Sequence, residues 1–247
     1  MIIGGRAHSL HDVERIAQEG FQFAEISILD EQSFMAELGH LKRMQNMYGI
    51  TYLAHGPEEG AATDPEILRR EYVPRIQSVL DAACELSIGL CTIHFWLDKR
   101  FIPHEYFSAK LELLRDMVGY AVKRSVLLCI ENLSEHFSDF AEAFTLLGDL
   151  GMTLDIGHGA LMTERNTTYE FTRQCFDRIH HIHIHDNWGG ESAADDLHLP
   201  LGQGTIDFAP MLGGLKQKGF DKTITLEVRP EYLATCSRTL HRLWESL

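Results

Sequence analysis

The sequence predicts a single α/β domain, residues 1–247, folded as a (β/α)8 (TIM) barrel. Eight short apolar runs rich in β-branched residues recur along the chain, segments with helical periodicity separate them, and nearly every run ends in a polar residue. Such alternation produces a parallel sheet covered by helices, either closed into a barrel or open and doubly wound. An open sheet would hold its second and eighth strands too far apart to share one site, so the barrel is favoured.

The predicted strands are short, and no linker or low-complexity tract interrupts the series. They are residues 1–4 (MIIG), 23–28 (FAEISI), 51–55 (TYLAH), 90–95 (LCTIHF), 127–132 (LLCIEN), 152–157 (MTLDIG), 181–185 (HIHIH) and 223–228 (TITLEV).

Helical periodicity and end signals place helices between several of these strands. The segment 11–20 ends at Gly20, a plausible C-cap. In the segment 64–87, Asp64 is the expected N-cap and Pro65 the first helical residue, whereas Pro74 should kink or split the helix. Further helices are predicted over 103–125 and, more weakly, 207–219.

Composition narrows the class of protein. With 22 basic and 36 acidic residues the net charge is −14, which argues against a nucleic-acid partner because phosphate binding depends on Lys and Arg. The five cysteines show no CxxC spacing, as expected for reduced thiols in a cytoplasmic protein. No signal peptide or membrane span is predicted. The oligomeric state stays open.

Polar residues at the strand ends indicate the site. In a (β/α)8 barrel such side chains converge at the carboxyl mouth. The set contains no cysteine, so it predicts a nitrogen and oxygen site for Zn²⁺, Mn²⁺ or a similar divalent ion. Its members are Glu25, His55, His94, Glu131, Asp155, His183, His185 and Glu227.

The stretch HIHIHDNWGGESAADDLHLPLGQG, residues 181–204, concentrates further candidates. Alternation turns its first three histidines into the barrel, and we favour His183 as the ligand, with His185 contacting substrate. The loop returns Asp196 and His198 as a flap over the mouth. Gly202 and Gly204 are expected to let that loop turn back or approach a ligand.

Other residues complete the candidate pocket. His158 follows Asp155 by three residues and is a further metal or substrate ligand. Trp96, Trp188 and Arg229 follow ligand-bearing strands and are expected to wall the substrate pocket. The remaining histidines are interpreted as surface or structural, namely His8, His11, His40, His104, His136, His180 and His241.

Taken together, the motifs AHGP, IHF, CIEN, LDIGH, HIHIHDN, DLHLPLGQGTID and LEVRP make the whole chain resemble the xylose isomerase-like barrel superfamily. That group includes sugar isomerases and epimerases as well as endonuclease IV-type AP endonucleases. The epimerase branch implies one ion held by Glu131, Asp155, His183 and Glu227, with the two glutamates transferring protons. The endonuclease branch implies up to three zinc ions and adds His55, His94, His158, Asp196 and His198.

The resemblance therefore leaves several functions open. We rank a metal-dependent sugar isomerase or epimerase first, acting on a carbohydrate through an enediolate. The segment GPEEGAATDP after His55 is acidic and lacks the aromatic and basic residues expected of a DNA-inserting loop, so a multi-zinc phosphodiester hydrolase ranks second. A non-catalytic metal-dependent barrel that binds small molecules is the third possibility.

Overall fold

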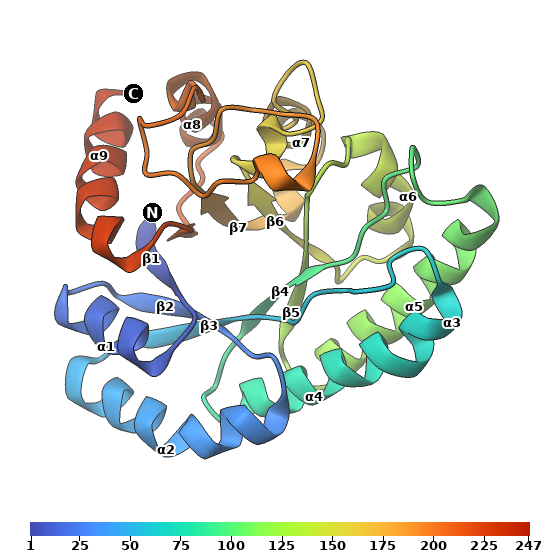
Figure 1. Ribbon diagram of the computed structural model, residues 1–247, viewed down its shortest axis with the longest axis horizontal. Helices are drawn as coiled ribbons and strands as arrows, with labels where there is room; N and C mark the ends of the chain where they lie inside the picture. Colours follow the sequence, from blue (N-terminus) through green and yellow to red (C-terminus); the bar gives the residue numbers. More distant parts are fainter.

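The computed structural model describes residues 1–247 and shows a closed barrel of eight parallel strands in sequence order (Figure 1). The predicted barrel is thus confirmed. The strands are β1 (Ile2–Ala7), β2 (Phe23–Ser27), β3 (Thr51–His55), β4 (Leu90–His94), β5 (Leu127–Glu131), β6 (Gly151–Asp155), β7 (Ile179–Ile184) and β8 (Thr223–Leu226).

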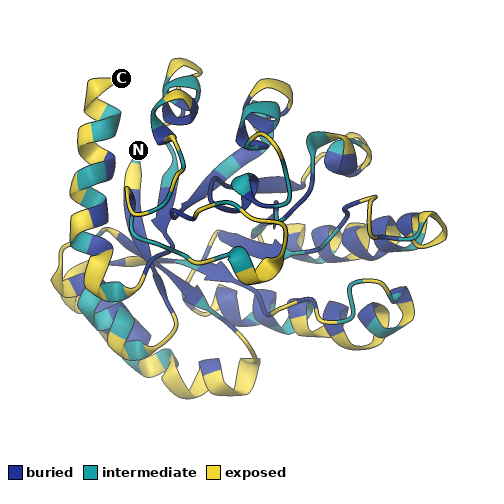
Figure 2. Ribbon diagram, turned by 45° about the horizontal axis from the view of Figure 1, so that its top comes forward, coloured by how far each residue is buried: buried dark blue, intermediate teal, exposed yellow.

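Helices surround the barrel and bury one face each against the strands. Figure 2 shows their inner faces buried and their outer faces exposed, and 64 buried residues form one hydrophobic cluster. The helices are α1 (Leu10–Gln18), α2 (Glu31–Tyr48), α3 (Pro65–Ile67), α4 (Val73–Cys84), α5 (His104–Val122), α6 (Phe137–Leu146), α7 (Thr168–Gln174), α8 (Phe208–Gln217) and α9 (Leu233–Ser246). Single turns of 3-10 helix occur at 158–160, 176–178, 193–195 and 230–232.

The segment predicted as one helix over 64–87 is divided. Asp64 caps the backbone N–H groups of Glu66 and Ile67, and Pro65 begins α3, as the sequence indicates. A π-helical segment, Leu68–Tyr72, then precedes α4, in which Pro74 is the second residue. Because proline has no N–H to donate to the preceding turn, the wider π turn accommodates the interruption without ending the helical path.

Strand β1 is longer than predicted, and the difference matters for the site. Gly4 and Gly5 resemble a strand end in sequence, yet the strand continues and pairs Arg6 with Glu25. Gly4 is required there because a Cβ atom would lie 2.5 Å from the carbonyl oxygen and the ring of Phe23. The strand therefore carries Arg6 to the mouth of the barrel.

The interior of the barrel is polar, whereas branched apolar side chains usually fill this space. Thr92 and Thr153 hydrogen-bond to each other at 2.8 Å across the interior. His181 contacts Glu25 and the hydroxyl of Thr225 at 3.1 and 3.0 Å. All five side chains are buried, so hydrogen bonds among them replace those they would make with water.

Two further features agree with the composition. All five cysteines are free, and four of them are buried. No helix is both long and apolar enough to cross a membrane.

Gly4→Ala should destabilise the protein, because the new methyl group would overlap Phe23. We expect a loss of about 1–3 kcal/mol in the free energy of unfolding, measured by urea titration. Gly119→Ala in α5 is the matched control, because a Cβ there meets no atom within 4 Å. It should stabilise the protein by about 0.5–1 kcal/mol. Equal effects of the two substitutions would contradict the close packing of β1 on Phe23.

Candidate metal centre and active site

Parallel register brings polar side chains from several strands to one mouth of the barrel. Strands β4 and β5 pair His94 with Glu131, and strands β6 and β7 pair Asp155 with His183. Glu227 lies directly after β8, beside the same mouth. The side chains of Glu131, Asp155, His183 and Glu227 thus meet, although they come from distant parts of the sequence.

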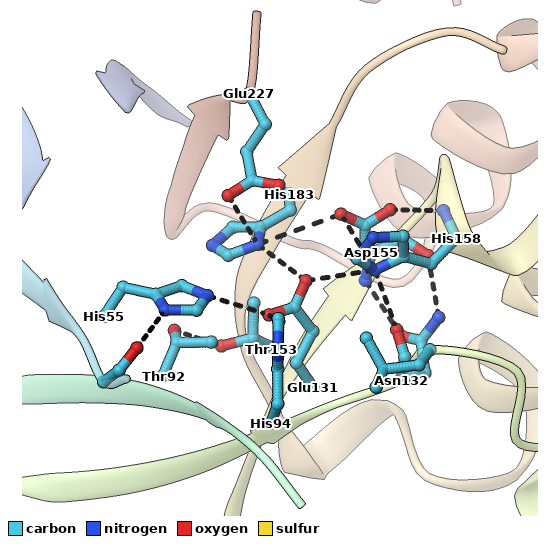
Figure 3. A network of polar contacts seen from close by, with 12 residues as sticks. His55, Thr92, His94, Glu131, Asn132, Thr153, Asp155, His158, His183 and Glu227 are labelled. Atoms are coloured by element: carbon cyan, nitrogen blue, oxygen red, sulfur yellow. Dashed lines mark hydrogen bonds and ion pairs between the residues drawn. The ribbon is translucent and has the colours of Figure 1, made fainter. Parts of the chain in front are cut away.

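Three carboxylates surround one nitrogen of His183 (Figure 3). Its Nδ1 lies 3.0 Å from Oε1 of Glu131, 3.4 Å from Oε1 of Glu227 and 3.8 Å from Oδ2 of Asp155. All four residues are buried, and each offers a ligand atom within 4.8 Å of the other three. One imidazole nitrogen and three carboxylate oxygens suit a single divalent ion of the Zn²⁺ or Mn²⁺ type.

The hydrogen-bonding pattern around Asp155 fits a cation. Asn132 fixes the backbone of Asp155 through two hydrogen bonds of 2.9 Å, one to its N–H and one to its carbonyl. Oδ2 of Asp155, however, is buried and has no hydrogen-bond partner. A buried carboxylate oxygen without a donor is costly, and a metal ion would satisfy it.

The other oxygen of Glu131 faces a second group of candidate ligands. Its Oε2 lies 3.2 Å from Nε2 of His55 and 3.1 Å from Nε2 of His94. Nδ1 of His55 donates to the carbonyl of Gly56, which turns Nε2 toward Glu131. Nδ1 of His94 contacts the carboxylate of Glu58 at 3.2 Å. Glu131 therefore belongs to two adjoining groups that share its carboxylate.

A third group of candidate ligands lies beside the first two. Oδ2 of Asp196 is 3.1 Å from Nε2 of His158 and 2.9 Å from Nε2 of His198. His185 stacks on His198 with ring centroids 4.1 Å apart, and both of its buried nitrogens lack a hydrogen-bond partner. A Cβ on Gly157 would lie 2.2 Å from the His185 ring, so only glycine leaves room for it. The structure thus adds His185, expected as a substrate contact, to these candidate ligands.

A buried layer beneath the mouth orients His183. Oε2 of Glu25 lies 2.8 Å from Nε2 of His183 and 3.1 Å from Nε2 of His181. Nδ1 of His181 contacts the hydroxyl of Thr223 at 2.7 Å. When Glu25 accepts a hydrogen bond from Nε2 of His183, Nδ1 is left to face the three carboxylates. The sequence placed Glu25 near the site without indicating this contact.

Charge pairing shifts the pKa of several of these groups. Burial alone would raise the pKa of Glu131, but the charges of His183 and His94 outweigh it and hold the pKa well below its usual range. Glu227 follows the same pattern, because His183 and Arg6 lower its pKa against burial. For His94, burial would lower the pKa, yet the charges of Glu131 and Glu58 raise it to about 10. The imidazoles thus supply positive charge that a divalent ion would otherwise provide.

Two adjoining cavities open onto these groups. The first, of ≈ 330 Å³, reaches the ends of β1 and β8 and includes Arg6, His8 and Arg229. The second, of ≈ 290 Å³, is lined partly by Trp96 and Leu161. Both cavities share Glu58, His94, His158 and Asp196 in their walls.

Two of the three residues predicted to wall the pocket line a cavity, and the third does not. Arg229 lines the first cavity and Trp96 the second, where its Nε1 donates to Ser134. The placement predicted for Trp188 is corrected by the structure. This residue is 65% exposed, its indole N–H donates to the carbonyl of Gln203, and it lines neither cavity. His8, interpreted as a surface or structural residue, is exposed and also lines the first cavity.

Sequence reasoning also missed two charged residues of the cavity walls. Arg6 lay beyond the predicted end of the first strand, residues 1–4. Glu58 was read only as part of an acidic loop, yet it contacts His94 and lines both cavities. A signal for Arg6 did exist, since a charged residue follows the apolar run and its two glycines directly.

The two glycines of the loop after β7 serve the loop itself. The backbone N–H groups of Gly202 and Gly204 donate to Oδ2 of Asp186 at 2.8 and 2.9 Å. Gly202 has a left-handed φ of +88°, and a Cβ on Gly204 would lie 2.2 Å from the carbonyl oxygen of Asn187. These contacts fold the loop back over the mouth and place Asp196 and His198 there.

Comparison with known proteins agrees with this architecture. The sequence pattern of the xylose isomerase-like TIM barrel family matches residues 13–242. The chain belongs to this family. An uncharacterized protein of Methanocaldococcus jannaschii is similar to this xylose isomerase-like chain, with 26% identity over 87% of this chain and 77% of the relative.

Solved structures share the fold of this xylose isomerase-like chain from end to end. A D-tagatose 3-epimerase-like protein superposes with a TM-score of 0.84 and 23% identity, covering 100% of this chain and 98% of that one. The IolI protein, crystallised with a bound zinc atom, superposes with a TM-score of 0.82 and 18% identity, covering 100% and 99%.

The charge pairing predicts a pH dependence of stability in EDTA-treated protein. The pKa of His94, about 10 when folded, lies above the ordinary histidine value of about 6.5. The contribution of His94 to the free energy of unfolding is therefore complete below pH 6.5 and is lost as the pH rises toward 10. We expect the thermal midpoint to fall by several degrees between pH 7 and pH 10. The His94→Gln variant should show a shallower fall over the same range, and an unchanged slope would contradict this pairing.

Proposed function

We propose that this chain is a divalent-metal-dependent isomerase or epimerase of sugars or sugar-like polyols. The observation that carries the proposal is the position of Glu131 and Glu227, which approach the same nitrogen of His183 from β5 and from the end of β8. Two buried carboxylates on different sides of one ligand group can take a proton from a substrate carbon and return one. The D-tagatose 3-epimerase-like neighbour supports a sugar as substrate.

The proposed metal ligands are Glu131, Asp155, His183 and Glu227, and one ion is expected. A bound Zn²⁺ or Mn²⁺ would supply Lewis-acid polarisation of the sugar carbonyl, which acidifies the neighbouring C–H bond. The zinc atom of the IolI structure supports this assignment.

Proton transfer is assigned to the glutamate pair. Both carboxyls have a lowered pKa, so they are ionised at neutral pH and either can accept the proton. Loss of the C–H proton leaves an enediolate of the sugar. Return of a proton to the same carbon from the other face inverts it. Return to the former carbonyl carbon, together with transfer of the neighbouring hydroxyl proton to the former carbonyl oxygen, gives the isomer. Trp96, Arg229, His158 and His185 are proposed to contact the rest of the sugar.

Glu131→Gln and Glu227→Gln should each abolish exchange of the substrate C–H proton with solvent, because an amide cannot accept it. We expect a loss of about 100-fold or more, followed by deuterium incorporation into a panel of ketoses by NMR at saturating metal. Glu142→Gln, an exposed change in α6, is the matched control and should retain the wild-type rate. Full activity of either site variant would remove that glutamate from the mechanism.

A metal-dependent phosphodiester hydrolase is the second candidate, and the three adjoining ligand groups favour it. All nine residues implied by the endonuclease branch lie in these groups, with Glu131 shared between two of them. The acidic balance of the chain and the acidic Glu58 at the mouth weigh against a nucleic-acid substrate. In the third alternative, a non-catalytic binding barrel, the ligands would bind metal and sugar without turnover.

The double variant Asp196→Ala/His198→Ala separates the two enzymes. For a one-metal isomerase, sugar turnover should weaken while the metal content, measured by elemental analysis, is unchanged. For a multi-zinc hydrolase, the variant should lose about one equivalent of metal together with phosphodiesterase activity. We expect unchanged metal content, and no cleavage of an abasic-site duplex by the wild type in low salt. Efficient cleavage with loss of one ion would reverse our ranking.

A further inference from the structure

Two arginines lie in the wall of the first cavity where the ends of β1 and β8 meet. Arg6 is the penultimate residue of β1, and Arg229 follows Glu227 by two positions. Both line the ≈ 330 Å³ cavity, and His8 lines it as well. Burial and the charge of Arg6 lower the pKa of His8, so this ring adds a hydrogen-bonding group rather than a charge.

Arg6 is buried but incompletely paired. Its side chain is 9% exposed, and its nearest carboxylates are Glu227 at 3.5 Å from Nε and Glu25 at 3.8 Å from Nη1. Nη1 has no hydrogen-bond partner. A guanidinium has five N–H donors in a fixed plane, and burying them without acceptors is costly. Arg6 also lines the cavity, so an acceptor bound there would lie beside a guanidinium whose charge is only loosely paired.

Arg229 is exposed, and the acidic groups of the cavity pair with other partners. Glu58 contacts His94, and Asp196 contacts two histidines of the third ligand group. Glu227 pairs with Arg6, His183 and His198 rather than with Arg229. This wall therefore presents a guanidinium charge that no carboxylate of the mouth neutralises.

We propose that the substrate carries an anionic oxygen group, a carboxylate or a phosphate, which binds between Arg6 and Arg229. The planar fork of a guanidinium matches two oxygens of either group, and such charge-assisted hydrogen bonds are stronger than those to a neutral hydroxyl.

This inference rests on the proposed function, because it places the anionic group on a sugar bound at the metal centre. The test avoids turnover by using three polyols without an aldehyde or ketone group, namely D-glucitol, D-gluconate and D-glucitol 6-phosphate. Binding of each to the full chain at one fixed metal content is measured by calorimetry. We expect gluconate or the phosphate ester to bind about tenfold or more tightly than glucitol. Whichever of these two ligands binds more tightly identifies the anionic group as a carboxylate or a phosphate.

Two variants attribute this preference to the arginines. Arg229→Gln and Arg6→Gln should each reduce the ratio of anion affinity to glucitol affinity severalfold, because any loss of contacts to the polyol hydroxyls weakens both ligands alike. Arg242→Gln, an exposed change in α9, is the control and should keep the preference. If Arg6→Gln does not fold, Arg6→Lys should still weaken binding of the anion, because a lysine has no bidentate fork, and Arg229→Gln decides the result.

Two outcomes would overturn the inference. Either neither anion binds more tightly than glucitol, or the preference survives Arg229→Gln, as it would if the anion bound only to the metal ion. Failure of the proposed function is seen separately, as the absence of deuterium exchange with any ketose. That result would leave the polyol affinities standing.

Discussion

The burial of several carboxylates around the His183 imidazole is the constraint on which the site depends. Glu25, Glu131, Asp155 and Glu227 all lie at the barrel mouth or just beneath it, where burial removes most of the water that would solvate their charges. Such charges persist in a folded protein only with partners of opposite sign. His183 contacts all four, through Nε2 to Glu25 and through Nδ1 to the other three.

That constraint extends outward through shared ligands. Glu131 uses Oε1 toward His183 and Oε2 toward His55 and His94, so the first two ligand groups are held by one carboxylate. The third group is linked to the first through Asp155, whose Oδ1 lies 3.3 Å from Nε2 of His185. A change in the charge of any one group will therefore shift the pKa values of the others, whether protons or metal ions provide the positive charge.

Because the barrel interior is polar, the hydrophobic contribution to stability comes from the layer between the strands and the surrounding helices. Threonine, histidine and glutamate side chains occupy space that apolar residues fill in most barrels, and their hydrogen bonds offset the loss of hydration without adding a hydrophobic contribution. The cluster of 64 buried apolar residues between the strands and helices supplies that contribution instead. The site can thus remain polar because the fold does not depend on the barrel interior for its hydrophobic core.

The sequence by itself determined the barrel and the composition of the mouth. Strand periodicity and the polar residues at the strand ends are local signals, and the parallel order of strands then requires those residues to lie at one end. Tertiary structure decided which atoms face each other. Arg6 reaches the mouth because Gly4 lets β1 pack against Phe23, and Trp188 lies outside the cavities, where its indole N–H donates to the carbonyl of Gln203. His185 joins the ligands because Gly157, distant in sequence, leaves space for its ring. Such contacts depend on the close approach of segments far apart in the chain, which no local pattern records.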